Sequence, residues 1–256
     1  MTTPENLWQR CDGPSRIAPL SARPVRVVES QEQAATSLLV DSAAEQLLLE
    51  RILEESKPPL PPEGAGYHYL ITTPFRYPPL KYGSRFGTRT RCGIFYGSLA
   101  VRTALAECAY YRLLFWHGMT APPPRNRLDT EHTSFTVRVK TRHGIRLEEP
   151  PFDRFRQIIA HPADYRATQR LGEAMYEEGV EAFSYPSARD PAGGINLAVF
   201  RLAAIASRKP ADNTQWLCTT RADEVSFVAA HSREARYRFP LETFLHDGRL
   251  PQPALT

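Results

Sequence analysis

Apolar residues recur at helical spacing in three stretches, which predict the main helices of the chain. The first opens with Ser42 and Glu45, a capping-box pair, and continues as a run of leucine and isoleucine over residues 42–53. A second helix is expected over residues 98–117, where Ser98 is a suitable N-cap, and a third over residues 164–178.

Other segments carry the signature of strands. Residues 134–140 alternate apolar and polar positions, which is typical of a half-buried strand. Further strands are expected at residues 67–72, 94–97, 182–185, 197–200, 225–229 and 237–239. Because helices and strands do not alternate regularly, the pattern favours an α+β fold, a mixed β-sheet core with flanking helices, over a doubly wound one.

A proline-rich segment divides the chain. Residues 57–62 read Lys-Pro-Pro-Leu-Pro-Pro, which is typical of a stiff polyproline linker. We therefore expect an N-terminal helical extension and linker over residues 1–63, in which the first 29 residues are coil with one short strand. A catalytic domain would follow over residues 64–240, with a C-terminal tail over residues 241–256.

Composition and charge limit the classes of molecule that the protein is expected to bind. Hydrophobic residues make up 42% of the 256 positions and the formal net charge is +4, too small an excess to predict a nucleic-acid-binding stripe. Arginine dominates the basic residues and suits bidentate binding of phosphate or carboxylate. The start of the chain lacks a signal-peptide pattern, no run of about 18 apolar residues predicts a membrane span, and the cysteines form no CxxC pair. We expect a cytoplasmic protein without a metal site.

Glu107 is the unusual residue of the second predicted helix. The helix is apolar on nearly all sides, and the neighbours of Glu107 at i±3 and i±4 include no basic residue. Burying an unpaired carboxylate is costly. Glu107 must therefore meet a cation from elsewhere, face a cleft, or lie on a narrow solvated stripe.

A glycine-bounded turn supplies a candidate anion-binding arginine. Arg85 lies in Gly83-Ser84-Arg85-Phe86-Gly87, where glycine lets backbone approach a ligand and the guanidinium can clamp an oxyanion. Arg76 and Tyr77 lie upstream in a loop rich in proline. The turn has neither the GxxxxGK[ST] frame nor the GxGxxG frame, which disfavours a P-loop kinase or a Rossmann dehydrogenase.

Three further polar residues complete the candidate site. Tyr96 lies eleven residues after Arg85 and eleven before Glu107, so all three are expected near one end of a strand–helix unit. Ser187 follows a predicted strand and Asn196 follows two glycines. No GxSxG elbow surrounds Ser187, which argues against a hydrolase triad.

Together these residues resemble the RES family, the toxins of bacterial toxin–antitoxin pairs named for an arginine, a glutamate and a serine. The segments that carry the resemblance are Phe75-Arg76-Tyr77, Gly83-Ser84-Arg85-Phe86, Ile94-Phe95-Tyr96-Gly97, Thr103-Ala104-Leu105-Ala106-Glu107, and Tyr185-Pro186-Ser187 followed by Gly193, Gly194 and Asn196. The chain departs from the family at Gly87, where an Asn or Asp is usual two positions after the central arginine.

The resemblance implies a fold like that of the diphtheria-type ADP-ribosyltransferases and cleavage of NAD⁺ at the nicotinamide–ribose bond, with phosphate or water as acceptor. It gives Arg85, Glu107 and Ser187 catalytic roles. Arg76, Tyr77, Tyr96 and Asn196 would bind NAD⁺.

The resemblance also implies a partner, an Xre-type antitoxin with a DNA-binding helix-turn-helix, and it is compatible with a toxin homodimer. No direct nucleic-acid or membrane binding is expected. Two other interpretations stay open at this point: ADP-ribosyl transfer to a protein, and a basic module without enzymatic activity that binds nucleic acid or protein.

Overall fold

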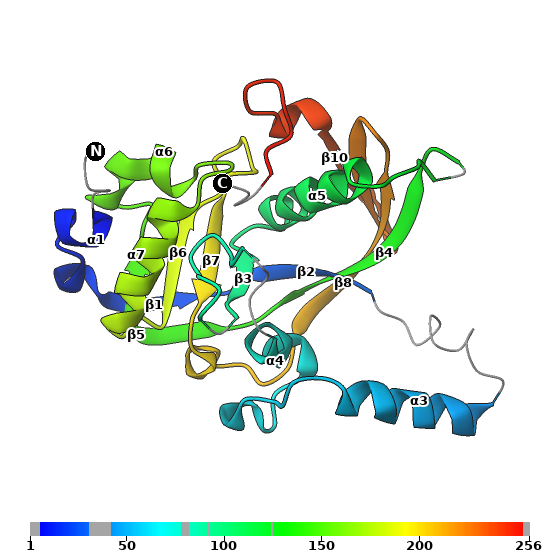
Figure 1. The fold of residues 1–256 in the computed structure, drawn as a ribbon, viewed down its shortest axis with the longest axis horizontal. Helices are drawn as coiled ribbons and strands as arrows, with labels where there is room; N and C mark the ends of the chain where they lie inside the picture. Colours follow the sequence, from blue (N-terminus) through cyan, green and yellow to red (C-terminus); the bar gives the residue numbers. More distant parts are fainter. Residues whose placement is uncertain (1–5, 31–41, 78–81, 92, 124, 253–256) are drawn as a thin grey trace.

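The fold was analysed in a computed structural model that describes residues 6–30, 42–77, 82–91, 93–123 and 125–252. Ten strands form one sheet in the order β1-β5-β6-β7-β3-β2-β4-β8-β9-β10 (Figure 1). Only β5 and β6 pair in parallel among the described strands; every other neighbouring pair is antiparallel. The strands are β1 (Ala18–Ala22), β2 (Val25–Glu29), β3 (Phe95–Ser98), β4 (Leu128–Thr136), β5 (Val139–Arg146), β6 (Ala182–Pro186), β7 (Ile195–Val199), β8 (Ala211–Thr220), β9 (Glu224–Ala229) and β10 (Ser232–Pro240).

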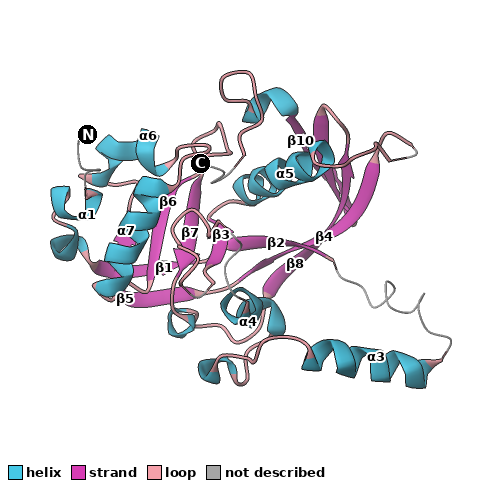
Figure 2. Cartoon of the chain, viewed as in Figure 1, coloured by secondary structure: helices cyan, strands magenta, loops and turns pink. Residues whose placement is uncertain are grey.

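Helices lie on both faces of this sheet (Figure 2). The α-helices are α1 (Leu7–Arg10), α3 (Ala43–Glu55), α4 (Tyr69–Arg76), α5 (Val101–His117), α6 (Arg156–Ile159) and α7 (Arg166–Glu177). Short 3-10 helices span Gly13–Arg16, Pro62–Gly64, Phe152–Phe155, Leu202–Ala204 and Leu241–Phe244. The mixed sheet and its flanking helices confirm the predicted α+β fold class.

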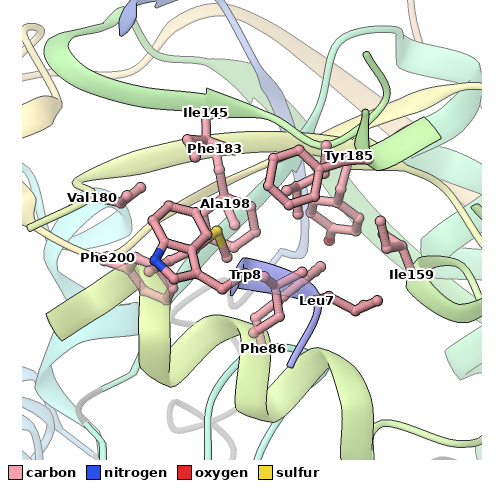
Figure 3. Packing of buried hydrophobic residues seen from close by; sticks show 14 of the residues in the cluster. Leu7, Trp8, Phe86, Ile145, Ile159, Val180, Phe183, Tyr185, Ala198 and Phe200 are labelled. Atoms are coloured by element: carbon pink, nitrogen blue, oxygen red, sulfur yellow. The ribbon is translucent and has the colours of Figure 1, made fainter. Parts of the chain in front are cut away.

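Alternation along the central strands separates two cores. Phe183 and Ala198 pack in a cluster with Trp8 of α1 (Figure 3). Met175 of α7 belongs to the same cluster. Leu197, the neighbour of Ala198 along β7, instead joins a cluster on the other face with residues of α4. Successive side chains of a strand point to opposite faces, so β6 and β7 are covered on both sides, which explains why both strands are mainly apolar.

The N-terminal residues contribute two strands to the sheet, whereas coil with one short strand was predicted for the first 29 residues. Strand β1 pairs with β5, and β2 lies between β3 and β4 near the centre of the sheet. Both strands are five residues long, and their partners β5 and β4 lie more than 100 positions away along the chain. The proposed boundaries at residues 63 and 240 stay predictions.

Helix α3 confirms the predicted helix after Ser42, whose hydroxyl accepts a hydrogen bond from the Glu45 amide at 3.2 Å. The helix projects away from the sheet in Figure 1. Its apolar side chains are largely exposed, at 65% for Leu47 and 53% for Ile52.

Two predicted strands are wrong in type or extent. Residues 67–72 were expected as a strand, but most of them belong to α4, where the His68 ring caps the helix by accepting from the Leu70 amide. The strand expected over residues 134–140 is divided between β4 and β5, because the Val137 amide turns to the Pro24 carbonyl. Strand β8 was not predicted.

In the described part of the chain, no helix is long and apolar enough to span a membrane.

Candidate functional site

A cleft of about 990 Å³ opens beside one face of helix α5. The α5 residues that line it are Ala104, Glu107, Cys108, Tyr111, Arg112 and Phe115, whose spacing of three and four residues keeps them on one side of the helix. Strands β2, β3 and β4 and the 82–85 turn supply most of the other walls. The volume is that of a pocket for a small-molecule ligand, at the upper end of the usual range of roughly 300–1,000 Å³.

Glu107 lines this cleft, and two side chains donate hydrogen bonds to its carboxylate. Its Oε1 accepts a hydrogen bond from the Ser187 hydroxyl at 2.7 Å and another from Asn196 Nδ2 at 2.6 Å. Asn196 is itself fixed, because its Oδ1 accepts from the Ser98 hydroxyl at 2.7 Å. Both hydrogen bonds to Glu107 fall on one carboxylate oxygen. Within the described residues Oε2 has no hydrogen-bond partner and is left to a ligand.

Ser187 lies at the centre of a tight turn after β6. Its Oγ accepts from the backbone amides of Arg189 at 3.0 Å and Asp190 at 3.1 Å, so the hydroxyl proton points to Glu107. Gly194 closes the turn through its carbonyl, and a Cβ there would lie 2.1 Å from Thr103 Oγ1. Ser187 is 5% exposed and is not among the residues that line the cleft. These contacts place Ser187 to orient Glu107, and the catalytic role predicted for it stays a prediction.

Arg85 is a buried guanidinium at the edge of the cleft. Its Nη1 donates to the carbonyl oxygens of Ile159 at 3.2 Å and His161 at 2.8 Å. Its Nη2 donates to the Tyr165 hydroxyl at 3.4 Å, and the guanidinium stacks on the Tyr165 ring at 4.4 Å. Carbonyl dipoles and an aromatic face orient this cation without neutralising it, which leaves a fixed positive charge for an anionic ligand.

Tyr96 joins the glycine-bounded turn to the sheet. Its hydroxyl lies 2.9 Å from Ser84 Oγ and accepts from the Phe86 amide at 3.3 Å. Burial raises the pKa of Tyr96 to about 12, so the phenol is protonated at neutral pH. Tyr96 lies on β3, so these hydrogen bonds join the turn that carries Arg85 to the strand that precedes the helix with Glu107.

The glycines of this turn are required by its close approach. Gly83 has a φ of +74°, and a Cβ there would lie 2.2 Å from the Gly87 carbonyl oxygen. At Gly87 a Cβ would lie 2.9 Å from Ile94 Cδ1 and 3.0 Å from Ser84 Oγ. A polar side chain at 87 would lie against the Ser84 hydroxyl that pairs with Tyr96.

Arg76 and Tyr77 are not brought to the cleft. Arg76 ends α4 and its Nε donates to the Pro58 carbonyl, while Tyr77 is 39% exposed. Neither is among the residues that line the cleft. The segment that follows them, residues 78–81, lies outside the described residues. Their predicted contacts with a ligand stay predictions.

Sequence reasoning missed two residues of the site, Tyr165 and Arg189. Arg189 is 3% exposed, stacks on the Tyr110 ring at 3.5 Å and donates to the Tyr165 hydroxyl at 3.3 Å. Tyr165 thus accepts from two arginines and lines the cleft. Arg189 follows Ser187 by two positions and could have been included with it, whereas Tyr165 precedes α7 without any motif.

The described residues contain no cluster of three or more His, Cys, Asp or Glu side chains that could hold a metal ion.

A family model for the RES domain matches residues 61–221. The chain belongs to the RES domain family. The RES match spans the segments that carry Arg85, Glu107 and Ser187, whereas β1 and β2 precede it and β9 and β10 follow it.

One solved structure similar to this chain is the crystal structure of the M. tuberculosis MbcT–MbcA toxin–antitoxin complex. The similarity has 14% sequence identity and a TM-score of 0.49. The alignment covers 82% of this chain and 92% of that chain. A search of curated proteins finds no match.

Proposed function

We propose that this RES domain protein is the toxin of a toxin–antitoxin pair and cleaves NAD⁺ at the nicotinamide–ribose bond. The observation that carries the proposal is the Glu107 carboxylate, held on one oxygen by Ser187 and Asn196 at 2.7 and 2.6 Å with its other oxygen left to the cleft. An isolated, oriented carboxylate of this kind suits a transition state that develops positive charge.

The chemistry needs one carboxylate. When the N-glycosidic bond breaks, nicotinamide leaves with the bonding electron pair and becomes neutral, so no general acid has to protonate it. The ribose C1′ gains oxocarbenium character, which Glu107 would stabilise while its free oxygen holds the ribose hydroxyls. O-glycosidases need a second carboxylate because their leaving group is an alkoxide.

The fixed arginine supplies the anion-binding end. Arg85 would bind the pyrophosphate or an incoming phosphate, with its orientation set by the carbonyls of Ile159 and His161. Tyr96 would pack against the ring or ribose beside Glu107. For Arg76 and Tyr77 we keep the proposed phosphate and ring contacts, which require the α4 end to approach the cleft.

Phosphate or water then adds to the ribose carbon that nicotinamide has left. Phosphate forms ADP-ribose 1″-phosphate, and water forms ADP-ribose and releases a proton. We propose these acceptors over a protein, and an Xre-type antitoxin as the partner that controls the activity. A homodimer is compatible with the same proposal.

The experiment is product identification by mass. Purified protein is incubated with NAD⁺, with and without inorganic phosphate, and the small products and the protein are analysed separately. The proposal predicts free nicotinamide with ADP-ribose or its phosphate. Label from NAD⁺ on a macromolecule in place of these products would establish ADP-ribosyl transfer, and no nicotinamide release in either buffer would contradict the proposal.

A further inference from the structure

A turn that begins at His161 and ends at Tyr165 holds two buried guanidiniums. The His161 carbonyl oxygen accepts from Arg85 Nη1 at 2.8 Å. The next carbonyl oxygen, that of Pro162, accepts from Arg189 Nη2 at 2.5 Å. At the end of the turn the Tyr165 hydroxyl accepts from both arginines. The position of this turn therefore sets the position of both cations.

The His161 ring fixes the shape of the 161–165 turn. Its Nδ1 accepts from the backbone amides of Ala163 at 3.2 Å and Asp164 at 2.8 Å. Among the described residues no carboxylate forms an ion pair with either guanidinium. Because carbonyl oxygens, a hydroxyl and aromatic rings hold the two cations, their orientation depends on how firmly the turn itself is held.

Residues 241–251, here called the C-terminal segment, pack against this turn and against α5. The His246 ring lies edge to face against the His161 ring, with 5.5 Å between the ring centroids. A tight hairpin holds His246, because its amide donates to the Arg249 carbonyl at 2.9 Å and its carbonyl accepts from the Arg249 amide at 3.1 Å. In Figure 1 the segment is red and lies beside α5, and Phe244 joins the apolar cluster of that helix.

Tyr110 of α5 connects the C-terminal segment to the second guanidinium. Its hydroxyl donates to the Pro251 carbonyl at 2.6 Å, and its ring stacks on the Arg189 guanidinium at 3.5 Å. The segment thus reaches Arg85 through a pair of histidine rings and Arg189 through one tyrosine. The RES match ends at residue 221, so the segment lies outside the family model.

We propose that the C-terminal segment is a positioning element for the anion-binding end of the cleft, with His246 and Tyr110 as its positioning residues. Their contacts hold the 161–165 turn, and the turn holds Arg85 in its orientation before an anion arrives. The inference rests on the proposed function, which places phosphate groups at Arg85. Donors that are ordered in advance bind more tightly, because less freedom is lost on binding. Loss of these contacts should therefore weaken anion binding and leave the chemistry at Glu107 unchanged.

The test is calorimetric binding of inorganic pyrophosphate, together with steady-state cleavage of NAD⁺. His246→Ala should weaken pyrophosphate binding about fivefold through loss of one aromatic contact, and raise the KM for NAD⁺ equally at unchanged kcat. His246→Phe keeps a ring against His161 and should restore wild-type binding. Tyr110→Phe loses only the donor to Pro251 and should weaken binding about threefold. His231→Ala is the control, because His231 is exposed between β9 and β10 and does not line the cleft.

The His246 side chain is 47% exposed, so its replacement should leave the fold intact, which urea unfolding checks. Pyrophosphate that fails to bind the wild type, or that binds His246→Ala as tightly as the wild type, would overturn the positioning role. So would a His246→Phe protein that binds as weakly as His246→Ala, and tight binding by Tyr110→Phe would remove Tyr110 from the element. Wild-type protein that binds pyrophosphate through these contacts but releases no nicotinamide from NAD⁺ would overturn the proposed function and leave the positioning role standing.

Discussion

Replacement of Asn196 by aspartate tests the contact that orients the candidate catalytic glutamate. Asn196 Nδ2 donates to Glu107 Oε1 at 2.6 Å, and Asn196 is 2% exposed. Asn196→Asp keeps the shape of the side chain but places a second carboxyl group against the first. Two unit charges about 3 Å apart repel by about 5 kcal/mol at an effective dielectric constant of about 20.

Protonation of one carboxyl group limits this penalty and makes it depend on pH. The shared proton raises the pKa of the pair above the value near 4 of an unfolded aspartate. Below about pH 4 the new carboxyl group of Asn196→Asp is protonated and can still donate to Glu107, so stability should match the wild type. As pH rises above 4 the variant should lose stability relative to the wild type, by about 3–5 kcal/mol once the pair is ionised.

The assay is urea unfolding of both proteins between pH 4 and pH 8, with nicotinamide release measured on the same samples. Asn213→Asp is the matched control, because Asn213 is exposed on β8 and no described contact joins its side chain to a carboxylate. An Asn196→Asp protein whose stability difference from the wild type is the same at pH 4 and pH 7.5 would refute the described contact.

Three further changes test the surrounding site. Ser187→Ala should lower the rate of NAD⁺ cleavage about 10²-fold, because Glu107 loses a hydrogen bond that orients it. It should also lower the free energy of unfolding by about 2–4 kcal/mol, because two buried amides lose their acceptor. Steady-state kinetics and urea unfolding measure the two effects, and unchanged kinetics would contradict the positioning role. Tyr165→Phe should keep the ring stacks but raise the KM for NAD⁺ about tenfold, since Arg85 and Arg189 lose a shared acceptor; an unaltered KM would argue against this. The pKa of His132, lowered from 6.5 to about 4, predicts about 3 kcal/mol of stability lost as pH falls from 6.5 to 4, because the unfolded chain takes up the proton first. His132→Gln should abolish that part of the acid sensitivity in urea unfolding, and a variant as acid-sensitive as the wild type would count against a neutral buried ring.

The elements that sequence predicted well are those whose pattern is local. Helix α5 and strands β6 and β7 follow from mainly apolar segments with clear ends. Strands β1 and β2 carry little local signal and exist because β5 and β4, more than 100 residues away, pair with them. Residues 67–72 place Tyr67, Tyr69 and Ile71 at alternate positions, which resembles a strand pattern. In the structure Ile71 belongs to α4 and is buried against residues of the sheet.

The site divides in the same way. The spacing of Arg85, Tyr96 and Glu107 could be recognised in the sequence because a turn, a strand and a helix follow one another directly. Tyr165 could not, because it meets Arg85 only through a fold that joins positions 80 residues apart. The predicted neighbourhood of Glu107 included no cation, and the structure supplies neutral donors there from Ser187 and Asn196.

The central claim is that the Glu107 carboxylate drives cleavage of the nicotinamide–ribose bond. Glu107→Gln keeps an oxygen that can accept from Ser187 and Asn196 and removes only the charge, while Glu131→Gln on the exposed side of β4 controls for loss of a carboxylate elsewhere. We expect nicotinamide release from NAD⁺ to fall about 10²–10³-fold in Glu107→Gln, with unfolding unchanged, and to stay at the wild-type rate in Glu131→Gln. A folded Glu107→Gln protein that releases nicotinamide as fast as the wild type would contradict it.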